Sequence, residues 1–476
     1  MSHRWRFKLE YDDDAWNFGW FEWLGVALFA GIFVGALLAH GFAVDGVERA
    51  WGFAACGVFG AWGALAWGLG KYRPKAGGPG AWALALVAGL ALVAGLLAVP
   101  VPLGVAAALS PSWAEVRDMA RTAGMAPPAW VTLGISPDNA QPGFLQWAAS
   151  AAFLVGALAL AFRRRGAVAI CLVLALFSIF QGWIGALLSA LEGLGRSPGI
   201  FFNPNHHAAS TLAGLPIAWA FIVWARDNTD EGDGRGGYAD RKLFLQGLWL
   251  MALAGWLASL SRGSLLLGGP VLLGWAAWEF LARRRSPLGV AGRRRGRALE
   301  VGLVAAAFVV VVGLSPVVMP FLERLSPQSD VGRLPFWTAT WEGFLDSRGL
   351  GLGSGGAEHA ISRHLDGVPA RKVAVYSHND WIQLVAELGL AGVLWGLFAA
   401  AGLGRALLRQ GRVERQELAW ASRMPRRAAL AGLLALLAHA LVEFHLRMPA
   451  VGFQALALLA LLCERGTGRM SPEEES

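Results

Sequence analysis

Long apolar runs constrain this chain more than any other feature. A helix that crosses a bilayer needs about 20 mostly apolar residues, and runs of roughly that length recur twelve times among the 476 residues. Charged residues make up only 16% of the chain, against about 25% in a soluble protein. The predicted fold class is an all-α polytopic membrane protein with about twelve transmembrane helices. The predicted spans are 21–39, 50–69, 81–99, 144–162, 167–190, 208–225, 243–260, 264–282, 299–319, 382–402, 428–443 and 448–463.

The distribution of Lys and Arg predicts the orientation of these spans. Most of the 41 Lys and Arg residues fall in alternate connections when the N-terminus is placed in the cytoplasm, as the positive-inside rule requires. Both termini are then cytoplasmic, and the first span is a retained helix. Arg clusters at 163–165, 283–285 and 293–295 suit anionic membrane lipids. The net charge of +8 therefore indicates no nucleic-acid partner.

Four segments organise the chain on this topology. Residues 1–180 carry the first helices and an outer segment, 100–143, that has no sequence-based assignment. Residues 181–319 carry further spans, and 382–476 the last spans and a cytoplasmic tail. The long outer loop between helices 9 and 10, residues 320–381, exceeds a simple connector, so we expect it to be functional and partly helical. A short helix is predicted to begin near residues 331–337.

Polar residues gather in the outer connections. Asn203, Asn205, His206 and His207 precede the sixth span, where such groups are costly in lipid without partners. They are either a polar cap on that helix or part of a site. Adjacent histidines alone do not make a metal site. The three cysteines all lie in apolar stretches, so neither a metal cluster nor a disulfide framework is predicted.

An arginine lies in the tight outer turn between the seventh and eighth spans. Arg262, flanked by Ser261 and Gly263, is misplaced for an inner-face anchor. Its guanidinium suits a phosphate or carboxylate, although an arginine could also extend to the outer headgroups.

Two further outer segments carry candidate chemistry. Residues 349–356, hereafter the Gly-rich segment, lack a P-loop lysine. The segment could allow close backbone packing or bind an anion through amides, but a hinge is the favoured interpretation. His378 lies directly before the tenth span and could take a proton from a hydroxyl nucleophile, with Asp380 and Glu387 as alternatives.

Glu443 lies between the last two spans, four residues before Arg447. That spacing favours a structural ion pair between the two side chains, and a supporting role at the site is the alternative.

Cations and a histidine at the outer leaflet fit a diphosphate-linked lipid. Arginines would hold the diphosphate and offset charge on the leaving group, while the histidine would activate an acceptor hydroxyl. A lipid-linked donor is expected because nucleotide sugars are not available outside the cytoplasm.

The ordered motifs resemble the O-antigen ligase and polymerase superfamily, and most closely the ligases, over roughly residues 180–460. They are residues 199–208, Ser261-Arg262-Gly263, Gly332-Arg333 with Trp337, Gly351-Leu352-Gly353, and residues 378–381 running into 387–392.

The resemblance implies a GT-C-like, metal-independent, inverting glycosyltransferase without a cofactor, in the bacterial inner membrane with a periplasmic active site. Its donor would be an undecaprenyl-diphosphate-linked glycan. It implies His378 as the base and Arg262 and Arg333 as diphosphate ligands. Asn203, Asn205, His206, Asp380 and Glu387 are possible supporting residues, and the 206–207 pair offers a second base.

The acceptor stays open between classes that share these motifs. A ligase would use lipid A-core, which is the favoured interpretation, whereas an O-antigen or exopolysaccharide polymerase would use a growing glycan. Protein O-glycosylating ligases share the motifs too. A transporter or flippase for lipid-linked glycans is the alternative of another class, and it predicts ionisable residues near the bilayer midplane. The predicted spans are nearly free of charge at their centres, which favours chemistry at the interface.

Overall fold

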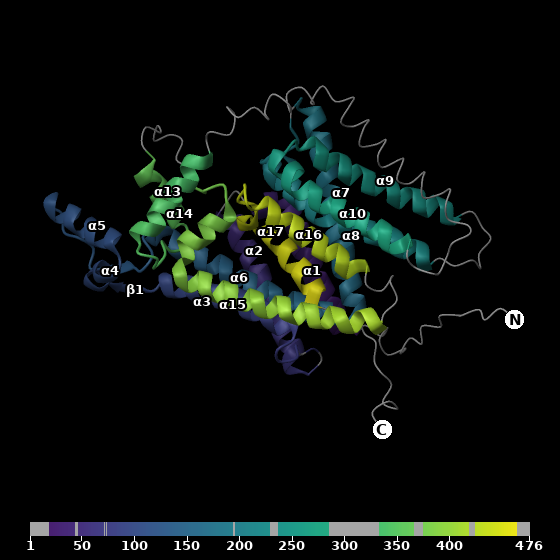
Figure 1. The fold of residues 1–476 in the computed structure, drawn as a ribbon, viewed down its shortest axis with the longest axis horizontal. Coiled ribbons are helices and arrows are strands. Elements are labelled where there is room, and N and C mark those ends of the chain that lie inside the picture. The colour runs from purple at the N-terminus through teal and green to yellow at the C-terminus, as the bar shows by residue number, and fades with distance from the viewer. Residues whose placement is uncertain are drawn as a thin grey trace.

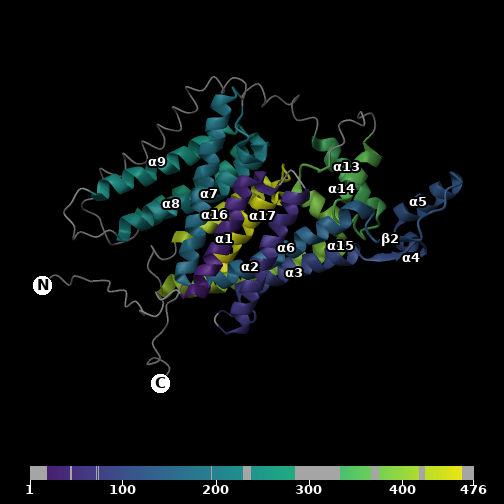
Figure 2. The ribbon, with the colours of Figure 1, turned by 180° about the vertical axis from the view of Figure 1, so that it is seen from behind.

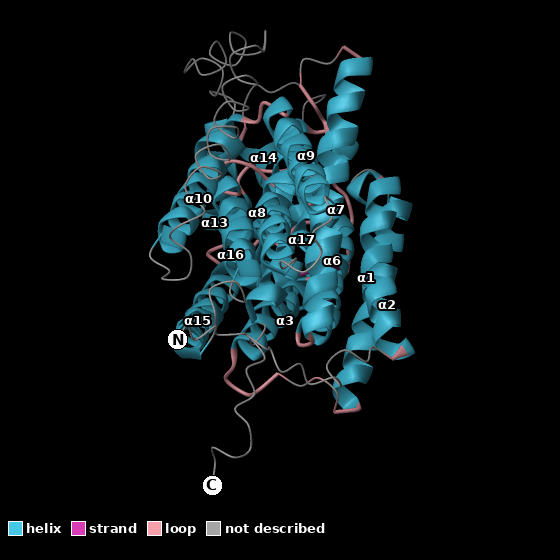
Figure 3. Cartoon of the chain, turned by 90° about the vertical axis from the view of Figure 1, so that its right-hand side faces the viewer, coloured by secondary structure: helices cyan, strands magenta, loops and turns pink. Residues whose placement is uncertain are grey.

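The computed structural model is a bundle of long helices (Figures 1 and 3). It describes residues 19–42, 46–70, 72, 74–193, 196–228, 237–284, 333–365, 375–417 and 424–463. The long helices are α1 (Trp20–Leu38), α2 (Gly46–Gly68), α3 (Pro79–Leu97), α6 (Pro137–Ala161), α7 (Arg164–Leu191), α8 (Pro204–Asn228), α9 (Gly237–Ala258), α10 (Gly269–Arg284), α15 (Asp380–Glu417), α16 (Met424–His439) and α17 (Pro449–Cys463). Each predicted span within the described residues falls on one of these helices. The span predicted at 299–319 lies outside them.

Six of the described helices are long and apolar enough to cross a membrane, namely α1, α2, α3, most of α6, α7 and α15. Exposed apolar side chains on α15, such as Leu394, Leu397 and Phe398, suit contact with lipid. The protein is therefore a polytopic membrane protein. The count of twelve spans stays a prediction, because α8, α9, α10, α16 and α17 do not meet the same standard of length and hydropathy.

Small residues let the N-terminal helices pack closely. A Cβ added at Gly60 or Gly63 would lie within 3 Å of backbone atoms of α6. Such close approach is typical of helix packing in lipid. Beside this contact, Phe29, Phe59 and Phe153 pack with ring centroids less than 6 Å apart. These contacts fix the first helices as a support for the rest of the bundle.

The outer segment 100–143 forms a small unit at one end of the bundle (Figure 1). β1 (Pro100–Pro102) pairs antiparallel with β2 (Trp130–Thr132), and α4 (Leu103–Leu109) and α5 (Pro111–Thr122) lie between them in the chain. Its buried Trp113 and Val131 share an apolar cluster with Phe344 and Leu352 of the outer loop. The segment therefore braces the loop that precedes α15.

That loop is partly helical, as predicted. It contains α13 (Arg333–Asp346) and α14 (Gly356–His364), and both lie near the end of α15 that carries Asp380 (Figure 2). Phe344 of α13 is buried, whereas Trp341 and Leu345 are exposed. One face of α13 therefore packs on the protein, and the other is left outward.

The Gly-rich segment is a close-packed connection, which is one of the interpretations that its sequence allowed, and its role as a hinge stays a prediction. Helix α15 is broken at Gly389, which has φ 65° and ψ −169°. The break frees the carbonyls of Ala386 and Glu387, which accept hydrogen bonds from the amides of Leu352 and Gly353 at 2.8 and 3.0 Å. Those two amides are thus occupied by the chain itself and do not form an anion site.

Candidate functional site

A tight turn between α9 and α10 presents Arg262. The chain reverses at Leu260, where φ is 48°, and continues into a π-helical turn, Ser264–Gly268. Trp256 Nε1 donates to Ser264 Oγ at 3.1 Å and so ties the two ends of the turn together. A Cβ at Gly263 would lie 2.7 Å from a methyl carbon of Val442. The turn is therefore packed against the α16–α17 connection, and Arg262 stands at a fixed place.

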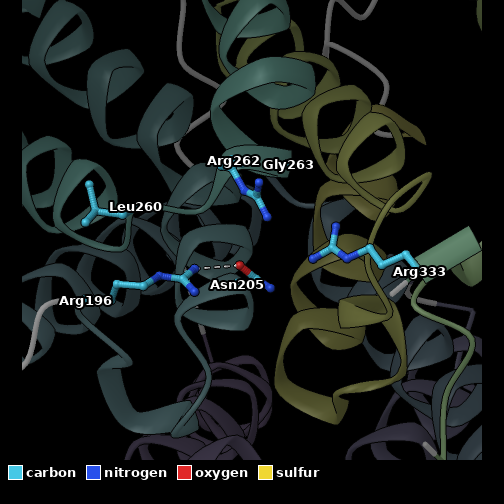
Figure 4. Close-up of a pocket in the computed structure, with 6 residues that line it drawn as sticks. All are labelled: Arg196, Asn205, Leu260, Arg262, Gly263 and Arg333. Atoms are coloured by element: carbon cyan, nitrogen blue, oxygen red, sulfur yellow. Dashed lines mark hydrogen bonds between the residues drawn. The ribbon is translucent and has the colours of Figure 1, made fainter. Parts of the chain in front are cut away.

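Three arginines surround a cavity of about 180 Å³ (Figure 4). Arg262 reaches it from the α9–α10 turn, Arg196 from the segment before α8 and Arg333 from the first residue of α13. We call this space the arginine cavity. Its remaining lining residues are Asn205, Leu260 and Gly263. Guanidinium groups are the side chains that suit a multiply charged anion best, which makes the arginine cavity a candidate anion site.

Sequence reasoning missed Arg196. Its Nη2 donates to Asn205 Oδ1 at 3.0 Å, and its Nε donates to the carbonyl of Ser259 at 3.1 Å. It therefore links the start of α8 to the α9–α10 turn. A signal was present, because Arg196 lies on the predicted outer side, three residues before the 199–208 motif, and the positive-inside rule disfavours an arginine there.

Glu443 connects the arginine cavity to His378. The Nδ1 atom of His378 lies 3.0 Å from Glu443 Oε1. Arg333 Nη2 donates to Glu443 Oε2 at 3.2 Å, and Nδ2 of the Asn205 side chain donates to the same oxygen. Arg333 Nη1 also donates to the carbonyl of Val442 at 2.8 Å. One fully buried carboxylate thus joins α8, α13 and the approach to α15.

The environment of Glu443 keeps it ionised. Burial by itself would raise the pKa of its carboxyl, but the hydrogen bond from His378 and the charge of Arg333 hold that pKa below its ordinary value. A buried carboxylate with three donors is compensated. Glu443 is therefore a negatively charged partner for both neighbours at neutral pH.

His378 is held at the entry to α15. Asn379 caps this helix, since its Oδ1 accepts from the amides of Trp381 and Ile382 at 3.0 Å each. The His378 ring packs edge-on against Phe444 with centroids 4.8 Å apart. Its side chain is 31% exposed, so the ring remains accessible from one side. Within the described part of the chain, no hydrogen bond engages its Nε2 atom.

Comparison with known families places these residues in context. Residues 247–395 match the family model described as O-antigen ligase. The chain carries an O-antigen ligase family region. The match confirms the superfamily that the motifs predicted, and it includes Arg262, Arg333 and His378 but ends before Glu443. No curated protein sequence matches the chain.

The two histidines at the start of α8 precede the O-antigen ligase family region in the chain, and their surroundings differ from each other. His207 is fully buried and its Nε2 lies 3.1 Å from the carbonyl of Gly255, which is a structural contact between α8 and α9. Asn203 caps α8 by accepting from the amide of Asn205 at 2.9 Å, as the polar-cap interpretation predicts. His206 is also buried and lies 3.4 Å from the Asn203 amide.

The predicted Glu443–Arg447 pair is wrong. Arg447 Nη1 instead lies 2.8 Å from Glu387 Oε2, and its Nε lies 3.8 Å from Asp380 Oδ1. The other Asp380 oxygen accepts from the amide of Leu446 at 2.9 Å. The side chains of Asp380 and Glu387 are thus held by Arg447 in a buried network, which meets Glu443 where the backbone amide of Asp380 donates to the Glu443 carbonyl at 3.1 Å.

The described residues contain no group of three or more His, Cys, Asp or Glu side chains that could hold a metal ion. Cys56, Cys171 and Cys463 are each buried, and none of these three described cysteines forms a disulfide bond.

Proposed function

We propose that this protein is a membrane glycosyltransferase that moves a glycan from an undecaprenyl-diphosphate-linked donor to an acceptor hydroxyl on the periplasmic face. The observation that carries the proposal is the adjacency of the arginine cavity to a carboxylate-bound histidine. A diphosphate is a multiply charged anion, and guanidinium forks match its oxygens. The favoured acceptor is lipid A-core, so the reaction is O-antigen ligation.

In this proposal each group has a chemical task. Arg196, Arg262 and Arg333 bind the diphosphate and stabilise the charge that develops on it as the bond to the sugar breaks. His378 Nε2 removes the proton from the acceptor hydroxyl. Attack from the face opposite the leaving diphosphate inverts the anomeric carbon. No metal ion is required in this scheme, since the arginines supply the positive charge.

The surroundings of the site support an interfacial reaction. Arg262 lies in the α9–α10 turn, Asn205 begins α8, His378 precedes α15 and Glu443 lies between α16 and α17. All four positions are helix ends, where a lipid headgroup lies, and the distribution of Lys and Arg assigns these ends to the periplasmic face of an inner membrane. On this proposal the chain has twelve spans, a GT-C-like architecture and both termini in the cytoplasm.

The proposal is tested with purified protein in liposomes. The donor is an undecaprenyl-diphosphate-linked oligosaccharide, supplied with lipid A-core, with excess donor alone, or with a control lipid. Transfer to lipid A-core indicates a ligase, and chain extension with donor alone indicates a polymerase. Movement of donor between leaflets without transfer would indicate a flippase and overturn the proposal.

Two variants test the assigned residues. Arg262→Ala and His378→Ala proteins should insert normally and lose transfer by about 100-fold or more. Arg117→Ala is the matched control, because Arg117 lies on α5, away from the arginine cavity, and forms an ion pair with the neighbouring Asp118. Wild-type rates in correctly inserted Arg262→Ala and His378→Ala proteins would show that the site is assigned wrongly.

A further inference from the structure

Glu443 contacts both halves of the proposed site. One of its oxygens accepts from His378 Nδ1 at 3.0 Å, and the other accepts from Arg333 at 3.2 Å. Arg333 lines the arginine cavity, whereas His378 does not. The Glu443 carboxylate therefore connects the two by direct contacts. Through it, a charge in the arginine cavity can change how strongly His378 holds a proton.

The two contacts compete for one negative charge. Without an anion in the cavity, the positive charge of Arg333 offsets much of the charge on Glu443. When an anion binds Arg333, the guanidinium shares its positive charge and its N–H donors between that anion and Glu443. The carboxylate then stabilises an imidazolium at His378 more strongly, because less of its charge is offset.

We propose that Glu443 is a positioning residue through which a diphosphate in the arginine cavity increases the proton affinity of His378. This inference rests on the proposed function and deepens it. Donor binding then switches on the base, so the histidine is most basic when a donor is present to react. The residue acts through His378 and Arg333 and does not itself touch the reacting atoms.

The geometry also fixes the tautomer of His378. A carboxylate that accepts from Nδ1–H leaves Nε2 without a proton. In the transfer step the acceptor O–H proton moves to Nε2 and the acceptor oxygen forms a bond to the anomeric carbon. The bond between that carbon and the diphosphate oxygen breaks, and its electron pair leaves with undecaprenyl diphosphate. The imidazolium then returns its proton to water.

Other charged and titratable groups surround this pair and bear on its pH dependence. They lie on several elements around Glu443, and none of them is changed in the variants of Glu443 that are compared below. They are Arg333 on α13, His206 on α8, His439 at the end of α16, Asp380 at the start of α15, and His445 and Arg447 beside Glu443 in the α16–α17 connection.

The experiment compares two pH–rate profiles in liposomes, with an undecaprenyl-diphosphate-linked oligosaccharide as donor and lipid A-core as acceptor. The profile of kcat reports the donor-bound protein, and that of kcat/KM for the donor reports the free protein. In the wild type, the acid limb of kcat should lie at higher pH than that of kcat/KM, by about one pH unit.

Glu443→Gln should move both acid limbs to lower pH, bring them closer together and reduce kcat by about tenfold or more. The gap should narrow but not vanish, since the diphosphate still acts directly on His378. Glu443→Asp should restore part of the gap, because it keeps the charge with a shorter reach. Glu115→Gln is the matched control, as Glu115 is a half-exposed carboxylate in an ion pair with Arg363.

A second variant covers the case in which Glu443→Gln does not fold. Arg333→Lys keeps a cation at the cavity but has one nitrogen in place of the fork that reaches both Val442 and Glu443. It should also narrow the gap between the limbs. If the pH difference between the two acid limbs is unchanged in either folded variant, the inference is overturned. The proposed function still stands in that case, provided that the wild-type protein transfers glycan. Absence of wild-type transfer to any acceptor overturns both.

Discussion

The guanidinium of Arg333 and the imidazole of His378 contact opposite oxygens of one carboxylate, that of Glu443, at 3.2 and 3.0 Å. The arginine cavity and the candidate base are therefore joined through a buried group. Arg333 and His378 both belong to the outer loop, whereas Glu443 lies in the short connection between α16 and α17, so this carboxylate ties two points of the loop to the last two helices.

Arg196→Lys should weaken use of the lipid-linked donor. Arg196 spans Ser259 and Asn205 with two nitrogens, which a single ammonium cannot do. Loss of one charge-assisted hydrogen bond costs about 1.5–3 kcal/mol, so kcat/KM for the donor should fall about 10- to 100-fold. Arg117→Lys on α5 is the control. Steady-state transfer assays measure this change. An unchanged kcat/KM for the donor would show that Arg196 does not bind the donor.

Glu443→Gln should lower thermal stability more at neutral than at acidic pH. The folded state holds the pKa of this carboxyl below its ordinary value, which is about 4.3 for Glu. Its ionised form therefore contributes stability that is fully present above that value and is lost as the pH falls through the lower folded pKa. The Tm difference between wild type and variant, measured in detergent from pH 3 to 8, should shrink below about pH 4. A difference that grows on acidification would contradict this.

Arg447→Met should destabilise the protein strongly. It leaves the carboxylates of Glu387 and Asp380 buried without their cation, and breaking a buried pair costs about 3–5 kcal/mol. The double variant Arg447→Met/Glu387→Gln should recover part of this loss, since it removes one stranded charge. Denaturant unfolding of the three proteins measures the coupling. A double variant no more stable than Arg447→Met alone would argue against the pair.

Two glycines of α15 should respond oppositely to alanine. At Gly389 φ is 65°, and a Cβ would lie 2.2 Å from the carbonyl oxygen of Leu350. Gly389→Ala should therefore cost about 1–3 kcal/mol or more. Gly404 lies in the same helix with no atom within 4 Å of such a Cβ. Gly404→Ala should be neutral or gain about 0.5–1 kcal/mol. Thermal unfolding separates the two, and equal effects would disprove the packing argument.

The sequence predicts those features that depend on the membrane as solvent. Apolar runs located each described long helix, because a helix satisfies its backbone hydrogen bonds within its own segment and can therefore cross lipid. Arg262 and His378 stood out for the same reason, as polar groups at helix ends. Both are found next to the Glu443 connection, Arg262 through Gly263 and His378 through a direct hydrogen bond.

Partner choice could not be predicted, and Glu443 shows why. The i,i+4 rule assumes a continuous helix, but α16 ends at His439 and a single 3₁₀ turn, His445–Arg447, follows. The two side chains therefore point to different networks. The role of residues 100–143 was hidden likewise, because its apolar contacts are with α13 and the Gly-rich segment, more than 200 positions further along the chain.

The position of Glu443 in the chain has a consequence for biosynthesis. Ribosomes make Asn205, Arg262, Arg333 and His378 before they make the α16–α17 connection. A nascent chain inserted up to α15 thus holds the cations and the histidine but lacks the carboxylate that joins them. The contacts of Glu443 with Asn205, Arg333 and His378 can therefore form only after the last two helices have been made.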